Sequence, residues 1–182
     1  MSINADKRAP SESITLRISK PVLDNIKKEA DNKEISINTL ANQIFAHHVH
    51  WNNYAARAGL VAFPKPLLVK LMEEYTNKQV SEMAQYISKN HIKNMILLLR
   101  KEHTIETFLD VVESWVRASG FPFIREFDEE RKQHSFVIQH ELNKKWSLYL
   151  AELYKYVFEE LGTEKASFEI TDTTVIFKIR LR

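Results

Sequence analysis

Residues 13–19, SITLRIS, decide the fold of the N-terminal part of this chain. Polar and apolar side chains alternate through the stretch without a break, which is the pattern of a half-buried β-strand. Ile14, Leu16 and Ile18 share one face of this strand, and Ser13, Thr15 and Arg17 share the other. No second strand is predicted nearby, so the backbone groups of the stretch require a partner. The same strand of a second copy would supply one, giving a two-stranded antiparallel ribbon.

Two amphipathic helical patterns follow this predicted strand. Pro21 lies near the first turn of the first helix, where its missing N–H costs nothing, and Ser36 is a good N-cap for the second. The apolar stripes are Val22, Leu23, Ile26 and Ala30 on the first helix and Ile37, Leu40, Ala41, Ile44, Phe45, His48 and Val49 on the second. About 45 residues cannot bury enough surface to fold alone. We therefore expect the ribbon and both stripes to form an intertwined core shared by two chains.

The N-terminal part resembles the ribbon-helix-helix family of DNA-binding proteins, typified by the Arc and methionine repressors, over about residues 13–54. The matching runs are SITLRISKPVLDNIKKEA at 13–30 and ISINTLANQI at 35–44, separated by a polar turn. The chain departs from the family at Glu34, where a glycine usually stands two residues before the serine that opens the second helix. Asn32 is the nearest residue that tolerates a left-handed backbone.

The resemblance implies a set of DNA contacts. A paired ribbon fits the major groove of duplex DNA, and its outward positions in the family read base edges, which gives that role to Ser13, Thr15 and Arg17. The family holds a phosphate at the start of the second helix, which corresponds to Ser36, Ile37 and Asn38. From the sequence itself we add Lys7 and Arg8 on a flexible arm and Lys20 beside the backbone. The alternative for Arg17 is a solvated strand residue.

Composition sets further bounds. The chain has 182 residues, 44% hydrophobic and 27% charged, without cysteine, and its net charge is +2. These values are ordinary for a folded globular protein. Without cysteine there are no disulfides or thiolate metal sites. Because no long apolar run and no signal-peptide core occur, we expect a cytoplasmic protein that does not enter a membrane. Residues 1–50 carry seven basic and six acidic side chains, so DNA binding would depend on their placement.

The pattern predicts four segments: a disordered arm at 1–12, the DNA-binding domain at 13–54, a linker at 55–66 and a C-terminal domain at 67–182. The linker contains Gly59, Pro64 and Pro66. Beyond it, periodicity predicts helices over about 67–75, 80–98, 105–116 and 143–161, and strands over 121–127, 135–140, 168–170 and 175–181. This order predicts an α+β domain in which about four antiparallel strands carry helices on one face, following an N-terminal ribbon-helix-helix dimer.

Several residues could suggest a chemical site. His47, His48 and His50 cluster late in the second helix, and His134 and His140 share one face of a strand. They form no recognisable set of three or four metal ligands, so we interpret them as structural or exposed residues and expect no metal and no cofactor. Ser147 stands in a helix without a recognisable base, and we interpret it as a helix-surface serine. Glycine-rich phosphate loops are absent from the sequence. No enzyme is predicted, although scattered catalytic residues would leave no pattern.

The leading hypothesis is therefore a sequence-specific transcriptional regulator, expected to be a repressor-like protein that binds double-stranded DNA as a homodimer or higher oligomer. Its C-terminal domain would bind an effector or a protein partner, or would assemble dimers. The alternative is an antitoxin-type protein, in which a ribbon-helix-helix head is followed by a segment that wraps a protein partner. An independently folded C-terminal domain favours the regulator.

Overall fold

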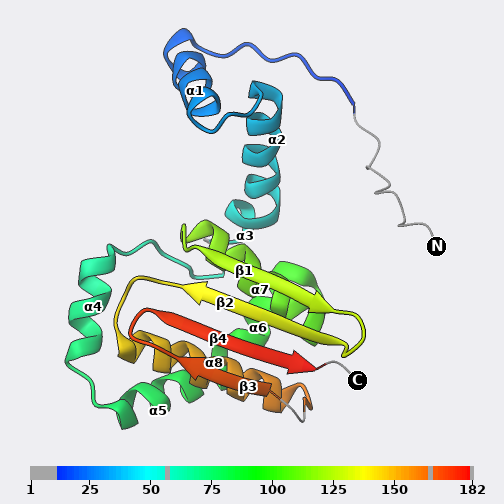
Figure 1. Cartoon of the computed structure of the whole chain (residues 1–182). Coiled ribbons are helices and arrows are strands. Elements are labelled where there is room, and N and C mark those ends of the chain that lie inside the picture. The colour runs from blue at the N-terminus through cyan, green and yellow to red at the C-terminus, as the bar shows by residue number, and fades with distance from the viewer. Residues whose placement is uncertain (1–11, 56–57, 164–165, 181–182) are drawn as a thin grey trace. The chain divides into compact units, whose positions relative to one another are not determined.

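The computed structural model describes residues 12–55, 58–163 and 166–180. The chain divides into two compact units, Met1–Phe45 and Ala46–Arg182. Figure 1 labels the α-helices and strands of both units. The predicted arm and the residues 56–57 of the predicted linker lie outside the described residues, apart from Glu12. The division falls before the predicted boundary at residue 54 because Trp51 and Tyr54 belong to the second unit, where Trp51 is buried and Tyr54 packs against the core.

The first unit contains α1 (Lys20–Asn32) and most of α2 (Ile37–His47), after an extended segment. Pro21 lies in the first turn of α1, and the Leu23 amide donates to the Ser19 carbonyl at 3.0 Å. Residues 12–19 form no strand within the described chain. The helices bury only Ala30 of α1 and Leu40 of α2. A single copy of this unit therefore has almost no core of its own.

The turn between α1 and α2 places Glu34 in the left-handed region, with φ at 54°. The Ile35 amide donates to the Ala30 carbonyl at 3.0 Å, and the Glu34 amide donates to the Asp31 carbonyl at 3.1 Å. These two bonds satisfy carbonyl groups at the end of α1. Glycine is the usual residue at the left-handed position of such a helix end. The left-handed residue is thus Glu34, while Asn32, which tolerates that conformation better, remains helical.

Because Glu34 holds a backbone conformation that costs an L-residue about 1 kcal/mol or more, we expect Glu34→Gly to raise the unfolding free energy of this unit by about 0.5–1 kcal/mol. The measurement is a urea titration followed by far-UV ellipticity. Tryptophan fluorescence tracks the second unit in the same samples, since Trp51, Trp115 and Trp146 all lie there. The matched control is Lys33→Gly, which should be destabilising because Lys33 has φ at −92°. Equal effects of the two changes would contradict the prediction.

The second unit begins at Ala46, near the end of α2, and continues with η1 (His48–Asn52) and α3 (Asn53–Ala55). Its further helices are α4 (Lys65–Glu73), α5 (Asn77–Ile87), η2 (Ser88–Ile92), α6 (Lys93–Arg100), α7 (Ile105–Ala118) and α8 (Lys144–Glu160). Thr104 and Asn143 cap α7 and α8 by accepting from Thr107 and Trp146 amides. Among the described residues, no helix is long and apolar enough to cross a bilayer.

The predicted helix at 80–98 is not a single α-helix, since the π-helical turn η2 separates α5 from α6. The buried positions along it are Val80, Ala84, Ser88, Ile92 and Ile96, a strict spacing of four residues. In an α-helix this spacing turns the buried face by about 40° at each step, because a turn holds only 3.6 residues. A wider π turn restores the alignment and keeps the face against the core.

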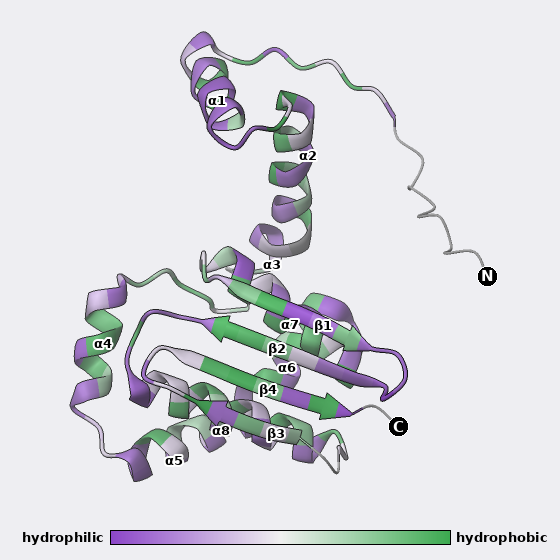
Figure 2. Cartoon of the chain, in the orientation of Figure 1, coloured by the Kyte–Doolittle hydropathy of each residue, from purple (hydrophilic) through white to green (hydrophobic). Residues whose placement is uncertain are grey.

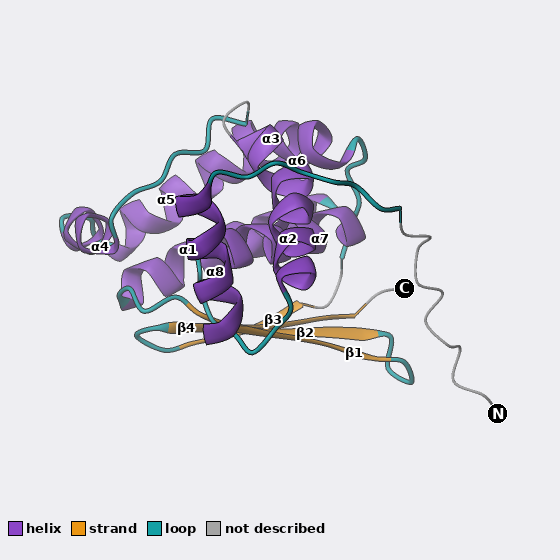
Figure 3. Cartoon of the chain, turned by 90° about the horizontal axis from the view of Figure 1, so that it is seen from above, coloured by secondary structure: helices purple, strands orange, loops and turns teal. Residues whose placement is uncertain are grey.

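The four strands form one antiparallel sheet in the order β1-β2-β4-β3. Their bounds are β1 (Phe123–Asp128), β2 (Gln133–Gln139), β3 (Ala166–Ile170) and β4 (Thr174–Arg180). The four strands and their antiparallel pairing confirm the predicted α+β sheet. Figure 3 shows that α4 to α8 all lie on one side of this sheet, as predicted. None of these five helices covers the opposite side.

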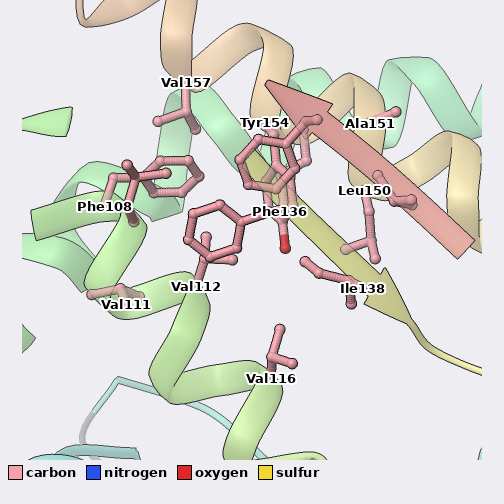
Figure 4. Packing of buried hydrophobic residues seen from close by; sticks show 14 of the residues in the cluster. Phe108, Val111, Val112, Val116, Phe136, Ile138, Leu150, Ala151, Tyr154 and Val157 are labelled. Atoms are coloured by element: carbon pink, nitrogen blue, oxygen red, sulfur yellow. The ribbon is translucent and has the colours of Figure 1, made fainter. Parts of the chain in front are cut away.

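Several aromatic side chains pack together within the mainly aliphatic core between sheet and helices. Phe136 and Phe177, paired across β2 and β4, stack with ring centroids 4.8 Å apart. Phe108 of α7 meets Tyr154 and Phe158 of α8 edge to face, each at 5.5 Å. Figure 4 shows Phe108, Phe136 and Tyr154 close together with aliphatic side chains from α7, α8 and β2 around them. These aromatics are core residues, and the unit needs no partner to bury them.

His140 and Ser147 form a buried pair where β2 leads into α8. His140 Nε2 and Ser147 Oγ are 2.8 Å apart, and the Leu142 amide donates to His140 Nδ1 at 3.0 Å. Because Nδ1 accepts, the neutral ring carries its hydrogen on Nε2 and donates it to Ser147. The prediction that Ser147 lies on the helix surface was wrong, since its side chain is fully buried. In this tautomer His140 cannot accept the serine proton, so the pair has no nucleophile geometry.

Burial, together with the nearby charge of Lys65, lowers the pKa of His140 from 6.5 to about 4. The unfolded chain therefore takes up a proton before the folded chain does as pH falls. The stabilisation is complete above pH 6.5 and is lost between pH 6.5 and pH 4, amounting to about 3 kcal/mol of unfolding free energy. Urea unfolding of the second unit, followed by tryptophan fluorescence at several pH values, measures this loss. His140→Gln should reduce the pH dependence by that amount, and an unchanged slope would contradict the assignment.

Candidate nucleic-acid interface

The extended segment at 12–19 is exposed along its whole length. Ile14 is 77% exposed, Leu16 49% and Ile18 41%, although the sequence places these three side chains on a buried face. No β-ladder within the described chain includes the segment. Figure 2 shows hydrophobic and hydrophilic residues alternating along it before α1. The single chain therefore leaves both the backbone groups and the apolar face of this segment unpaired.

The predicted base-contacting residues lie together on this segment. Ser13, Thr15 and Arg17 occupy alternate positions and are all exposed. Lys20 is the first residue of α1 and is exposed as well. Lys7 and Arg8 fall outside the described residues. The structure thus brings one arginine and two hydroxyls to a single short stretch, with a lysine at its end.

The start of α2 is an ordered, hydroxyl-capped helix terminus. Ser36 Oγ accepts from the Thr39 amide at 3.0 Å and lies 2.8 Å from Thr39 Oγ1. Ser36, Ile37 and Asn38 are all exposed. The capping bond uses the Ser36 hydroxyl, so a phosphate here would be held by the backbone N–H groups of the first turn. Sequence reasoning missed Thr39, whose spacing of three residues from Ser36 is the signal of a cap.

The two helices carry further unpaired apolar side chains. The exposed ones are Val22 of α1 and Ile37, Ile44 and Phe45 of α2. Together with Ile14, Leu16 and Ile18 they make up what we call the head face. A folded monomer rarely exposes so many large apolar side chains in about 35 residues. The head face has the composition of an interface with another protein surface.

The charges of this unit are balanced, with five basic and five acidic side chains in residues 12–45. Lys33 Nζ contacts Glu29 Oε1 at 2.6 Å, on the α1 end remote from the extended segment. Arg17 and Lys20 make no ion pair with another described residue. Both cations at the extended segment are therefore available to an anionic ligand.

The histidines and acidic residues of the described chain do not form a metal-binding group. No cluster of three or more His, Asp or Glu side chains there could hold a metal ion. His134 lies beside Phe127, with ring centroids 4.6 Å apart, and burial lowers its pKa. His140 bonds to Ser147 as described. His134 of β2 and His140, which directly follows β2, thus both pack against neighbouring side chains on the helix-covered side of the sheet.

Comparison of the chain with protein-family models, curated proteins and solved structures gave no match. A function for the chain is therefore inferred from its own residues and their geometry.

Proposed function

We propose that this chain is a sequence-specific DNA-binding transcriptional regulator of the ribbon-helix-helix type, acting as a dimer. The single observation that carries the proposal is the unpaired segment at 12–19. It alternates apolar and polar side chains, is exposed on both faces, and leads directly into α1 and α2. Pairing with the same segment of a second chain would satisfy its backbone groups and cover Ile14, Leu16 and Ile18.

In this arrangement the outer face of the paired segments carries two copies of Ser13, Thr15 and Arg17. A two-stranded ribbon has the width of the DNA major groove. Arg17 is suited to donate two hydrogen bonds to guanine O6 and N7, while Ser13 and Thr15 donate to or accept from other bases. Lys20 and the first turn of α2 then meet phosphates on either side, which fixes the register of the protein on the duplex.

The second unit supports a regulator over an antitoxin-type protein. A segment that wraps a partner remains disordered until it is bound. Residues 46–182 instead contain a large hydrophobic core between a four-stranded sheet and its helices. A unit with its own core is suited to sense an effector or to assemble chains.

The test is a selection of duplex DNA from a random library by the full-length protein. A pair of identical half-sites related by two-fold symmetry should be enriched, because two equivalent ribbons and helices contact the DNA. Binding to the selected site should weaken steeply as salt rises, through release of counterions from the phosphates. If no sequence is enriched over the starting library, the proposal fails.

A further inference from the structure

The face of the sheet turned away from the helices is uncovered in the second unit (Figure 3). Alternation along the strands sends Phe136, Ile138, Phe177 and Ile179 into the core. The side chains between them therefore point to the open face. The strand register places these open-face residues in rows across the sheet.

One row is apolar. Ile124 of β1 lies opposite Val137 of β2, which lies opposite Ile176 of β4. Ile124 is 56% exposed, and Val137 and Ile176 are half-buried by their neighbours on the sheet. Three large apolar side chains side by side across three strands form a continuous stripe. An antiparallel sheet with one solvated face would instead carry polar residues at such positions.

The next two rows are charged, with acid and base on different strands. In one row Glu126 of β1 and Lys178 of β4 flank Ser135, and in the other Asp128 and Arg180 flank Gln133. Strands β1 and β4 stand about 10 Å apart with β2 between them. No described residue forms an ion pair with Glu126, Lys178 or Arg180, and Asp128 is near only Arg131 of its own turn. On the open face, the edge strand β1 is thus acidic. Strand β4, two strands away, carries basic residues in the same rows.

This pattern is complementary to itself. If a second copy is turned by a two-fold axis that lies between the two faces and runs along β2, each β1 comes to face the other copy's β4. Ile124 then meets the other Ile176, and Val137 meets its own counterpart. Glu126 and Asp128 meet the other copy's Lys178 and Arg180 at their own levels. Small rotations of such an axis give the crossing angle usual for two packed sheets.

The other two-fold arrangement is less complementary. An axis running across the strands places each strand opposite itself. Centred on the charged rows, it would bring Glu126 against the other copy's Asp128, and Lys178 against the other copy's Arg180. Like charges in direct opposition disfavour an interface. Centred on the apolar row, the same axis would set Lys178 against the other copy's Thr174, which carries no charge. The axis along β2 is the arrangement that sets both charged rows against opposite charges.

We infer that the open face of the sheet is a self-association surface whose occupant is a second copy of this chain, packed face to face about an axis along β2. The surface, which we call the sheet face, comprises Ile124, Glu126, Asp128, Val137, Ile176, Lys178 and Arg180. Three strands of about six residues offer roughly 300 Å² per chain, which is below the usual size of a stable interface. The contact is accordingly weak and reversible. It does not depend on DNA binding by the first unit.

A cysteine cross-link tests the inference in the full-length chain, which has no natural cysteine. In Val137→Cys the new thiol lies on the axis, so a short bifunctional maleimide should join two chains across sheets packed about 10 Å apart. The matched control is Ser167→Cys on β3, which lies on the same side of the sheet but faces no residue of the second copy. The reaction is run at tens of micromolar and at about millimolar protein, so that contact is detected even if the first units do not pair.

Charge reversal in the Val137→Cys background gives the decisive comparison. Glu126→Lys with Asp128→Lys, or Lys178→Glu with Arg180→Glu, should each lower the cross-linked fraction at least about tenfold. Combining all four changes in one chain should restore it, because the charges are again complementary. Circular dichroism of each variant checks that the fold is unchanged.

Two results would overturn the inference. In the first, the Val137→Cys chains do not cross-link at either concentration, although their thiol reacts freely with a monofunctional maleimide. That result would mean that nothing covers the sheet face. The other is a Val137→Cys thiol that is protected from that reagent but not cross-linked, which means that something other than a second copy covers the sheet face. Cross-linking that is unaffected by charge reversal would contradict the proposed axis.

Discussion

Replacing Arg17 by alanine is expected to abolish sequence-specific DNA binding while leaving the dimer folded. Each dimer carries two copies of Arg17, and a good bidentate contact to guanine contributes about 1–3 kcal/mol of discrimination. Loss of both therefore weakens binding to the selected site by roughly 30-fold or more. Because Arg17 is exposed and makes no described ion pair, its removal should not change the stability of the protein. Binding is measured by fluorescence anisotropy with the selected duplex and with a scrambled duplex at the same salt concentration.

Lys28→Ala is the matched control for Arg17→Ala. It removes one positive charge from an exposed position of α1, so it changes net charge equally without altering the outer face of the ribbon. We expect a small, sequence-independent loss of affinity. If Arg17→Ala and Lys28→Ala weaken specific binding equally, Arg17 acts only through its charge and does not read bases.

Replacing Leu16 by alanine is expected to dissociate and unfold the first unit, although Leu16 is half-exposed in the single chain. In a shared core each Leu→Ala change costs about 2–5 kcal/mol, and a dimer carries two. The dissociation constant should rise about 1000-fold or more. On a surface the same change alters stability by at most about 0.5 kcal/mol. The two interpretations of residues 13–19 thus predict very different results for one substitution.

Thr15→Ala is the control for Leu16→Ala, because it alters the neighbouring residue on the opposite face. It should leave the dimer stable and weaken only DNA binding. The measurement is the urea midpoint of the ellipticity transition of the first unit at two protein concentrations. If the unit folds only as a dimer, its unfolding midpoint shifts with protein concentration. A concentration-independent midpoint for the natural chain, with equal stability of Leu16→Ala, would contradict a shared core.

The second unit could be predicted from local signals because its core closes within one chain. Thr104 and Asn143 mark the starts of α7 and α8, and Gly120 and Gly162 follow their ends with positive φ. Alternation in 121–127, 135–140, 168–170 and 175–181 predicted the four strands. The strand order could not be predicted, since several antiparallel orders bury the same alternating faces.

Other features lay beyond the sequence pattern for definite physical reasons. The η2 turn preserves the apolar spacing of a helix, so 80–98 was predicted as one helix, although the strict four-residue spacing from Val80 to Ile96 was a usable signal. The buried contact of His140 with Ser147 depends on how β2 enters α8, with Glu141 between them at φ 56°. No spacing rule contains that geometry. At the N-terminus, the sequence predicts a strand that a single chain has no means to complete.

The most direct test of a paired segment is isotope-filtered NMR on an equal mixture of labelled and unlabelled full-length chains. We expect nuclear Overhauser contacts between chains from the backbone protons of residues 13–19, in the cross-strand pattern of an antiparallel ladder. Ile14, Leu16 and Ile18 should contact the second chain's helices. If every contact of residues 13–19 arises within one chain, or none is seen while the amides exchange freely with water, the segment has no partner and the account of function fails.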